Sequence, residues 1–69
     1  MELLISKHAL EQAREKGISV NEIKETIQNG SKSLQDGKIL SNYRHIRVVF
    51  KKIANKFFVI TVMIRRNEK

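Results

Sequence analysis

The sequence predicts an α+β domain in the order strand, helix, helix and three strands, with a helical hairpin packed on one face of a curved antiparallel sheet. Three observations favour this fold class. Two helix-start patterns lie in the first 30 residues, an Asp-Gly pair follows them at 36–37, and the rest of the chain is rich in β-branched and aromatic residues. The 69 residues are enough for one domain, which we expect to span 1–69.

The first part of the chain contains a strand and two helices. The apolar run MELLI predicts the strand, and Ser6 fits the N-cap of a helix that ends near Gly17. Ser19 and Glu22 have the spacing of a capping box, which predicts a second helix that Gly30 stops. We expect Gly17 to adopt the left-handed conformation that commonly follows a helix.

The second half of the chain has the pattern of strands. The segment SKSLQ leads into Asp36-Gly37, a strong signal for a two-residue hairpin turn. The segment KILSNYRHIRVVFKK predicts the next strand, in which apolar residues alternate with Arg47 and Lys51. After a polar turn at ANK, the apolar run FFVITVMI over 57–64 predicts a central strand. Because two short helices cover only one side of such a sheet, we expect the polar strand residues on the other side.

The net charge of +7 belongs to the C-terminal half of the chain. Residues 1–35 carry five basic side chains and five glutamates, whereas residues 36–69 carry nine basic side chains, one aspartate and one glutamate. Such a field favours RNA, DNA, an acidic protein or an anionic membrane, and a solubilising charge excess is the plain alternative. The chain has no cysteine and no apolar run long enough to span a membrane, so we expect no disulfide, no membrane segment and a cytoplasmic location.

The segment NYRHIRVVFKK is the densest group of candidate binding residues. Four of its side chains share one strand parity and would project from one surface of an unbroken strand: Tyr43, His45, Arg47 and Lys51. Arginine and lysine bind phosphate, and tyrosine stacks on exposed bases, so this combination favours RNA. Arg44 has the other parity and points elsewhere unless a bulge intervenes. A solvated strand face is the alternative interpretation.

Three further side chains are candidates at the ends of elements. His8 falls at the second helical position, where the helix dipole disfavours its protonated form, as a general base requires; a packed histidine is the alternative. Arg65 and Arg66 follow the last strand and can either clamp a phosphate or form an exposed tail. Two histidines without cysteine offer no metal-ligand spacing, and no phosphate-binding loop occurs, so we expect neither a metal nor a cofactor.

The segments SKHALEQAREKGISVNEIKETIQNG, YRHIRVVFKK and FFVITVMI with its following arginine resemble small DUF-type proteins near the RelE/ParE toxin superfamily, with BrnT toxins distantly similar. The resemblance covers nearly the whole chain and implies a RelE-like fold and a toxin-type endoribonuclease that needs no metal. It also implies RNA as substrate, with or without the ribosome, and an antitoxin partner. His8, Arg47 and Arg65 match family positions, whereas Gln12 and Lys16 stand where the family pattern has arginine.

The leading hypothesis is therefore RNA cleavage with a catalytic group that consists of His8, His45, Arg47 and Arg65. The RNA-binding group consists of Tyr43, Arg44, Arg47, Lys51 and Arg66. Two alternatives remain open: an RNA-binding module without catalysis, and an interaction protein whose basic sheet docks an acidic partner. Relatives near ParE act on DNA gyrase, so a shared fold does not fix the target.

Overall fold

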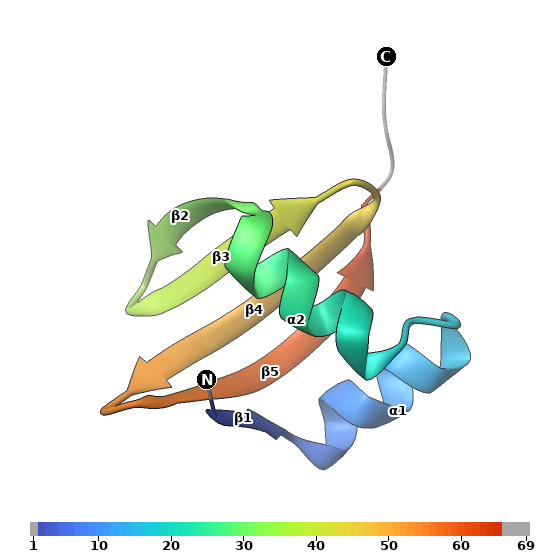
Figure 1. The fold of residues 1–69 in the computed structure, drawn as a ribbon, viewed down its shortest axis with the longest axis horizontal. Helices are drawn as coiled ribbons and strands as arrows, with labels where there is room; N and C mark the ends of the chain where they lie inside the picture. The colour runs from blue at the N-terminus through green and yellow to red at the C-terminus, as the bar shows by residue number, and fades with distance from the viewer. Residues whose placement is uncertain (1, 66–69) are drawn as a thin grey trace.

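The computed structural model describes residues 2–65, which form two helices and five strands (Figure 1). In chain order they are β1 (Glu2–Ile5), α1 (Lys7–Glu15), α2 (Val20–Asn29), β2 (Ser31–Gln35), β3 (Lys38–Tyr43), β4 (Ile46–Ile53) and β5 (Lys56–Ile64). The strands form one sheet in the order β1-β5-β4-β3-β2. The protein is a small α+β fold, and neither helix in the described part of the chain is long and apolar enough to cross a bilayer.

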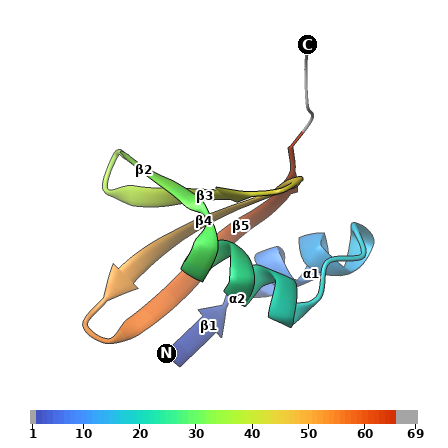
Figure 2. The ribbon, with the colours of Figure 1, turned by 45° about the horizontal axis from the view of Figure 1, so that its top comes forward.

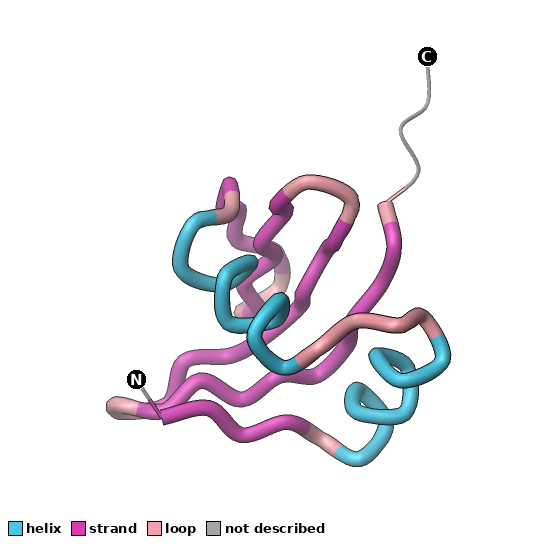
Figure 3. Tube along the Cα trace, turned by 45° about the vertical axis from the view of Figure 1, so that its right-hand side comes forward, coloured by secondary structure: helices cyan, strands magenta, loops and turns pink. Residues whose placement is uncertain are grey.

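The predicted topology is wrong in three respects. Residues 38–53 form two strands rather than one, so four strands follow the helices. The sheet is mixed rather than antiparallel, because β1 pairs with β5 in parallel while the other three strand pairs are antiparallel. The helices do not form a hairpin: α1 packs on β5, whereas α2 packs on β3 and β4 (Figures 1 and 3). The chain therefore does not adopt the predicted RelE-like arrangement.

A turn at Arg44 and His45 separates β3 from β4. Tyr43 pairs with Ile46 across it, and Arg44 has a φ of 57°. A positive φ in a two-residue hairpin turn normally calls for Gly, Asn or Asp, and neither turn residue is one of these, so the composition contains no signal for the turn. The predicted turn at Asp36-Gly37 is confirmed, with φ of 53° and 76°. Figure 2 shows this turn and the β4–β5 turn at one end of the sheet, opposite the Arg44–His45 turn.

The predicted helix boundaries are confirmed by their caps. The Ser6 side chain accepts a hydrogen bond from the Ala9 amide at 3.0 Å. At the start of α2 both bonds of the capping box are present: the Glu22 amide donates to the Ser19 hydroxyl, and the Ser19 amide donates to the Glu22 carboxylate. Each cap satisfies backbone amides that have no partner within the helix, which fixes where the helix begins.

Glycine is favoured after each helix, but for a different physical reason in each case. Gly17 has the expected left-handed φ of 69°. Gly30 has a φ of −76°, which any residue adopts, but a Cβ there would overlap the Ser41 hydroxyl and the Thr26 carbonyl oxygen. Glycine is therefore needed at residue 30 because α2 approaches β3 so closely.

The core lies on one face of the sheet, between the strands and the helices. It consists of Ala9, Ala13, Ile18, Ile23, Ile27, Ile46, Val48, Phe50, Val59 and Val62. We call this side of the sheet the covered face. Val48 and Phe50 alternate along β4, and their partners in β5 are Val62 and Val59, with Ile60 as the extra residue of a bulge. The alternation that the sequence predicts for β4 thus separates buried from accessible residues.

Candidate nucleic-acid interface

The face of the sheet opposite the helices carries the polar members of the strands, and we call it the open face. Because Val48 and Phe50 point to the covered face, the residues between and beside them point to the open face. The strand register extends this face across β3, β4 and β5. Its members there are Lys38, Leu40, Asn42, Arg47, Val49, Lys51, Ile53, Lys56, Phe58, Thr61 and Met63.

No acidic residue lies on β3, β4 or β5, and Glu2 of β1 is next to Lys56 at the far edge of the open face. From Lys38 to Arg65 the chain has seven basic side chains and no aspartate or glutamate. The described carboxylates lie on β1, on the two helices and in the β2–β3 turn. The positive charge of β3–β5 is therefore not neutralised within these strands, and such a surface attracts a polyanion.

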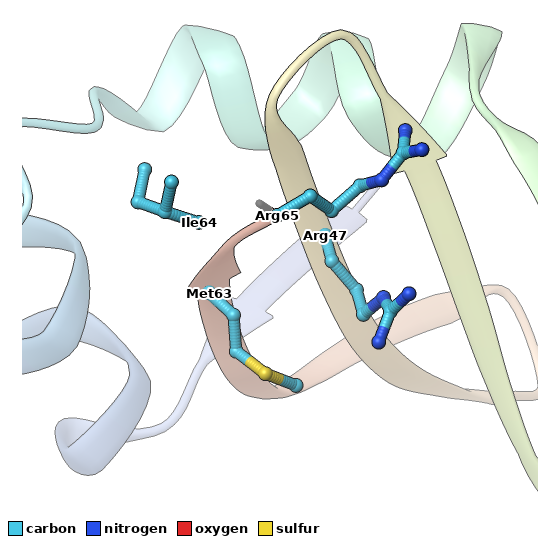
Figure 4. A pocket seen from close by; sticks show the side chains of 4 residues that line it. All are labelled: Arg47, Met63, Ile64 and Arg65. Atoms are coloured by element: carbon cyan, nitrogen blue, oxygen red, sulfur yellow. The ribbon is translucent and has the colours of Figure 1, made fainter. Parts of the chain in front are cut away.

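Arg47 and Arg65 line a hollow of about 270 Å³ at one end of the open face, together with Met63 and Ile64. Figure 4 shows both side chains on the same side of the hollow, with the Arg65 guanidinium above that of Arg47 in the view. The Arg47 Nε donates to the Asn42 side-chain oxygen at 2.8 Å, which orients the guanidinium of Arg47. A guanidinium has five N–H donors, so this bond leaves four for a ligand such as a phosphate.

The β3–β4 turn is tied to the same end of the sheet. The Arg65 amide donates to the His45 carbonyl oxygen at 2.7 Å, and the Arg65 Nη1 donates to the Arg44 carbonyl oxygen at 3.0 Å. The exposed Arg44 guanidinium stacks over the Tyr43 ring, 5.1 Å from its centroid. We call Arg44, Arg47 and Arg65 the arginine cluster, in which Arg44 lies with Tyr43 toward the covered face and Arg47 and Arg65 line the hollow of the open face. His45 is exposed beside it.

Two of the predicted binding residues do not lie beside Arg47 on the open face. Tyr43 pairs with Ile46 and points to the covered face, so the prediction that it shares a surface with Arg47 is wrong. The two-residue turn causes this, because it reverses the chain between Tyr43 and Arg47. Lys51 does share the open face with Arg47, four residues or roughly 13 Å farther along β4.

His8 lies apart from the arginine cluster. It lies at the second position of α1, as predicted, and its side chain is exposed. The start of α1 is fixed to β5 through Ser6, whose amide donates to the Val59 carbonyl oxygen and whose hydroxyl donates to that of Ile60. Ile60 is three residues, or roughly 10 Å, from Met63 at the hollow, and α1 covers the face opposite Arg47. Arg66 lies outside the described residues.

Two residues of the site were not predicted. Asn42 orients Arg47, and Phe58 is an aromatic side chain on the open face, 37% exposed and paired with Lys51. A signal for Phe58 existed, because adjacent strand residues point to opposite faces and Phe57 and Phe58 cannot both be in the core. The dependence of Arg47 on Asn42 follows from the unpredicted turn.

Gln12 has a structural contact. Its side-chain oxygen accepts a hydrogen bond from the Val62 amide at 3.1 Å, on the edge of β5 that β1 does not reach. An unpaired amide at that edge would cost free energy, so Gln12 completes the sheet from α1. In residues 2–65 no three histidine, aspartate or glutamate side chains gather where they could hold a metal ion.

Comparison with known proteins identifies one family. A family model described as a domain of unknown function, DUF4258, matches residues 5–64, which run from the end of β1 to the end of β5. No curated protein and no solved structure matches the chain.

Proposed function

This chain belongs to the DUF4258 family, and we propose that it is an RNA-binding domain that holds a single strand across the open face of its sheet. The observation that carries the proposal is the absence of acidic residues from β3–β5, with Arg47 and Arg65 at one end of the open face and Lys51 beside Phe58 farther along it. Phosphate contacts from arginine and lysine supply affinity, and an exposed aromatic ring supplies a stacking platform for a base.

The arrangement favours a single strand over a duplex. Arg47 and Lys51 are roughly 13 Å apart on one face, so they contact different phosphates of one chain. Phe58 lies directly opposite Lys51 on β5, where an unstacked base can reach its ring. The bases of a duplex are stacked on one another and do not offer their faces to a side chain.

The test is the salt dependence of RNA affinity, measured by fluorescence anisotropy with a labelled single strand and with its duplex. We expect the double variant Arg47→Gln with Lys51→Gln to bind the single strand more weakly, with the slope of log K against log salt reduced by about 1.4, since each phosphate contact contributes about 0.7. The matched control is Lys7→Gln with Lys24→Gln, which removes the same charge from the helices.

Equal losses in the two double variants would show that the field is diffuse and would reject an open-face site, and tighter binding of the duplex would reject the single-strand proposal. Phe58→Leu gives an independent test, because leucine keeps an apolar side chain but has no ring. We expect Phe58→Leu to weaken binding by about 1–3 kcal/mol without changing the salt slope.

RNA cleavage is a second candidate, favoured by the backbone bond that ties His45 to Arg65 beside Arg47. In this reaction His45 takes the proton of the RNA 2′-hydroxyl, whose oxygen attacks the adjacent phosphorus. A 2′,3′-cyclic phosphate forms, and the 5′-oxygen leaves and takes up a proton. Arg47 and Arg65 stabilise the negative charge of the pentacovalent phosphorane.

His45→Gln distinguishes cleavage from binding alone. Glutamine keeps a hydrogen bond but does not take up a proton near neutral pH. If the domain cleaves RNA, His45→Gln abolishes cleavage and keeps most of the RNA affinity, whereas His8→Gln, which lies on α1, changes neither. If the wild-type protein binds RNA and leaves it intact, with and without ribosomes, the binding function stands and cleavage is rejected.

Three wider expectations from the sequence motif remain predictions: kinship with RelE/ParE and BrnT toxins, action at the ribosome, and an antitoxin partner. An adjacent gene for a small protein with an acidic tail would support the toxin kinship. The proposed ligand, RNA, also leads us to propose a cytoplasmic site of action.

A further inference from the structure

The two helices leave part of the covered face exposed. An apolar groove of about 430 Å³ lies between the end of α2 and strands β3–β5. Its walls include Ile27 of α2, Ile39 of β3 and Phe57 of β5, and Phe50 of β4 also lines it. The groove is on the side of the sheet opposite the proposed RNA site, so it is a separate surface of the molecule.

Because α2 ends at the groove, the helix leaves apolar side chains of the strands beside it partly uncovered. Phe50 and Phe57 meet edge to face with their ring centroids 5.6 Å apart, and Ile39 pairs with Phe50 in the neighbouring strand. Leu34 of β2 pairs with Ile39 and is 77% exposed, which extends the apolar surface to the edge of the sheet. An exposed leucine beside an apolar hollow is typical of a protein-binding surface.

Two lysines also line the groove, one on each side of it in the sheet. Lys32 comes from β2, and its Nζ donates to the Gly30 carbonyl oxygen at 3.0 Å. Lys52 comes from β4, and its Nζ lies 5.8 Å from the centroid of the Phe57 ring. An ammonium group has three donors, so both lysines have donors left for a carboxylate after these contacts.

We propose that this groove binds an acidic segment of a partner protein. The segment places one large apolar side chain between α2 and the strands, and its flanking carboxylates contact Lys32 and Lys52. Charge complementarity selects this partner, because the apolar lining requires an apolar anchor and the two lysines require negative charge beside it. A second copy of the chain carries the same net charge of +7 and would be repelled.

The test starts from a displayed library of short random peptides, selected on the full chain. We expect enriched peptides to share one large apolar residue flanked by aspartate or glutamate. A synthetic peptide of that sequence should shift the amide resonances of Ile39 and Phe57 and should bind Lys52→Glu at least about tenfold more weakly. The same peptide with its glutamates changed to lysines should bind Lys52→Glu better than it binds the wild type.

Lys38→Glu is the matched control, because it makes the same charge change on the open face. Peptide affinity that falls equally in Lys38→Glu and Lys52→Glu would overturn the proposal that the groove binds an acidic segment. Enriched peptides without acidic residues, or self-association of the wild type through Leu34, would also overturn it. RNA affinity separates the two sites: Lys52→Glu should weaken RNA binding no more than Lys38→Glu does. A selective loss of RNA binding in Lys52→Glu would assign the groove to RNA instead.

Discussion

Val49 and Phe50 are neighbours in β4, but they lie on opposite faces of the sheet and in very different surroundings. Phe50 is 1% exposed and packs against Phe57 and the rest of the core. Val49 is half-buried, with Arg47 and Lys51 on either side of it along the open face. One strand therefore contributes to stability on one side and presents basic groups on the other, because successive side chains alternate.

The two faces also differ in which charged side chains lie on or near them. The helices over the covered face carry four of the glutamates, whereas the strands carry basic side chains and no carboxylate from residue 38 to residue 65. The separation means that the favourable attraction for a polyanion is directed to the open face. Substitutions on the covered face should therefore change the free energy of unfolding, and those on the open face should change binding.

The largest expected effect tests this division within β4. Phe50→Ala should lower the free energy of unfolding by about 3–5 kcal/mol, since it removes a buried ring and leaves a cavity. Val49→Ala should cost about 1 kcal/mol, because part of the valine is already in contact with water. Urea denaturation of both variants measures the difference, and equal midpoints would show that the two faces are not distinct.

The sequence predicts the faces of β4 well, and also the helices, because these depend on local features. Alternation over 46–50, the Ser19–Glu22 box and the Asp36-Gly37 turn each act through contacts between residues close in the chain. The direction of β1, in contrast, depends on a contact between residues that are distant in the chain. MELLI fits a strand in either direction, and only its pairing with residues 56–59, more than fifty positions away, makes it parallel.

One missed turn explains both an error in the predicted topology and an error in the candidate site. The turn at Arg44 and His45 has a positive φ without a glycine, asparagine or aspartate, so its residues do not mark it. Missing that turn places Tyr43 on the same face as Arg47, and the structure places it on the other. The approach of Arg65 to His45 is a contact across the sheet, which strand periodicity alone does not specify.

The second prediction concerns the close contact between the end of α2 and β3. Gly30→Ala should lower the free energy of unfolding by about 1–3 kcal/mol, because its Cβ would overlap the Thr26 carbonyl and the Ser41 hydroxyl. Gly17→Ala is the control, with a left-handed φ of 69° but no atom within 4 Å of the added Cβ. A smaller loss for Gly30→Ala than for Gly17→Ala would mean that α2 moves away from β3 without penalty.

The third prediction tests whether a polar residue on the helix side is also structural. Gln12→Ala should cost about 1 kcal/mol and speed hydrogen exchange at the Val62 amide, which loses its acceptor. Gln12→Glu keeps an acceptor oxygen and should preserve the protection of Val62, whereas Gln12→Arg has only donors and should behave like the alanine variant. Unchanged exchange at Val62 in Gln12→Ala would contradict this assignment.

The smallest expected effect compares two turns whose first residues have nearly the same φ and different side chains. Arg44 begins the β3–β4 turn with a φ of 57°, and Ala54 begins the β4–β5 turn with a φ of 55°. Both φ values are unfavourable for an L-residue, so Arg44→Gly and Ala54→Gly should each raise the free energy of unfolding, by about 0.5–1 kcal/mol.

Their effects on RNA should differ, because only Arg44 belongs to the arginine cluster. Arg44→Gly should weaken binding of the single strand and reduce the salt slope by about 0.7, one phosphate contact. Ala54→Gly should leave the RNA affinity and the salt slope unchanged, although we expect the same gain in the free energy of unfolding as in Arg44→Gly. If Ala54→Gly alone gains stability, the arginine side chain stabilises its own turn through the contact with Tyr43. If both variants bind RNA like the wild type, Arg44 does not contact the strand, and the interface is limited to the open face itself.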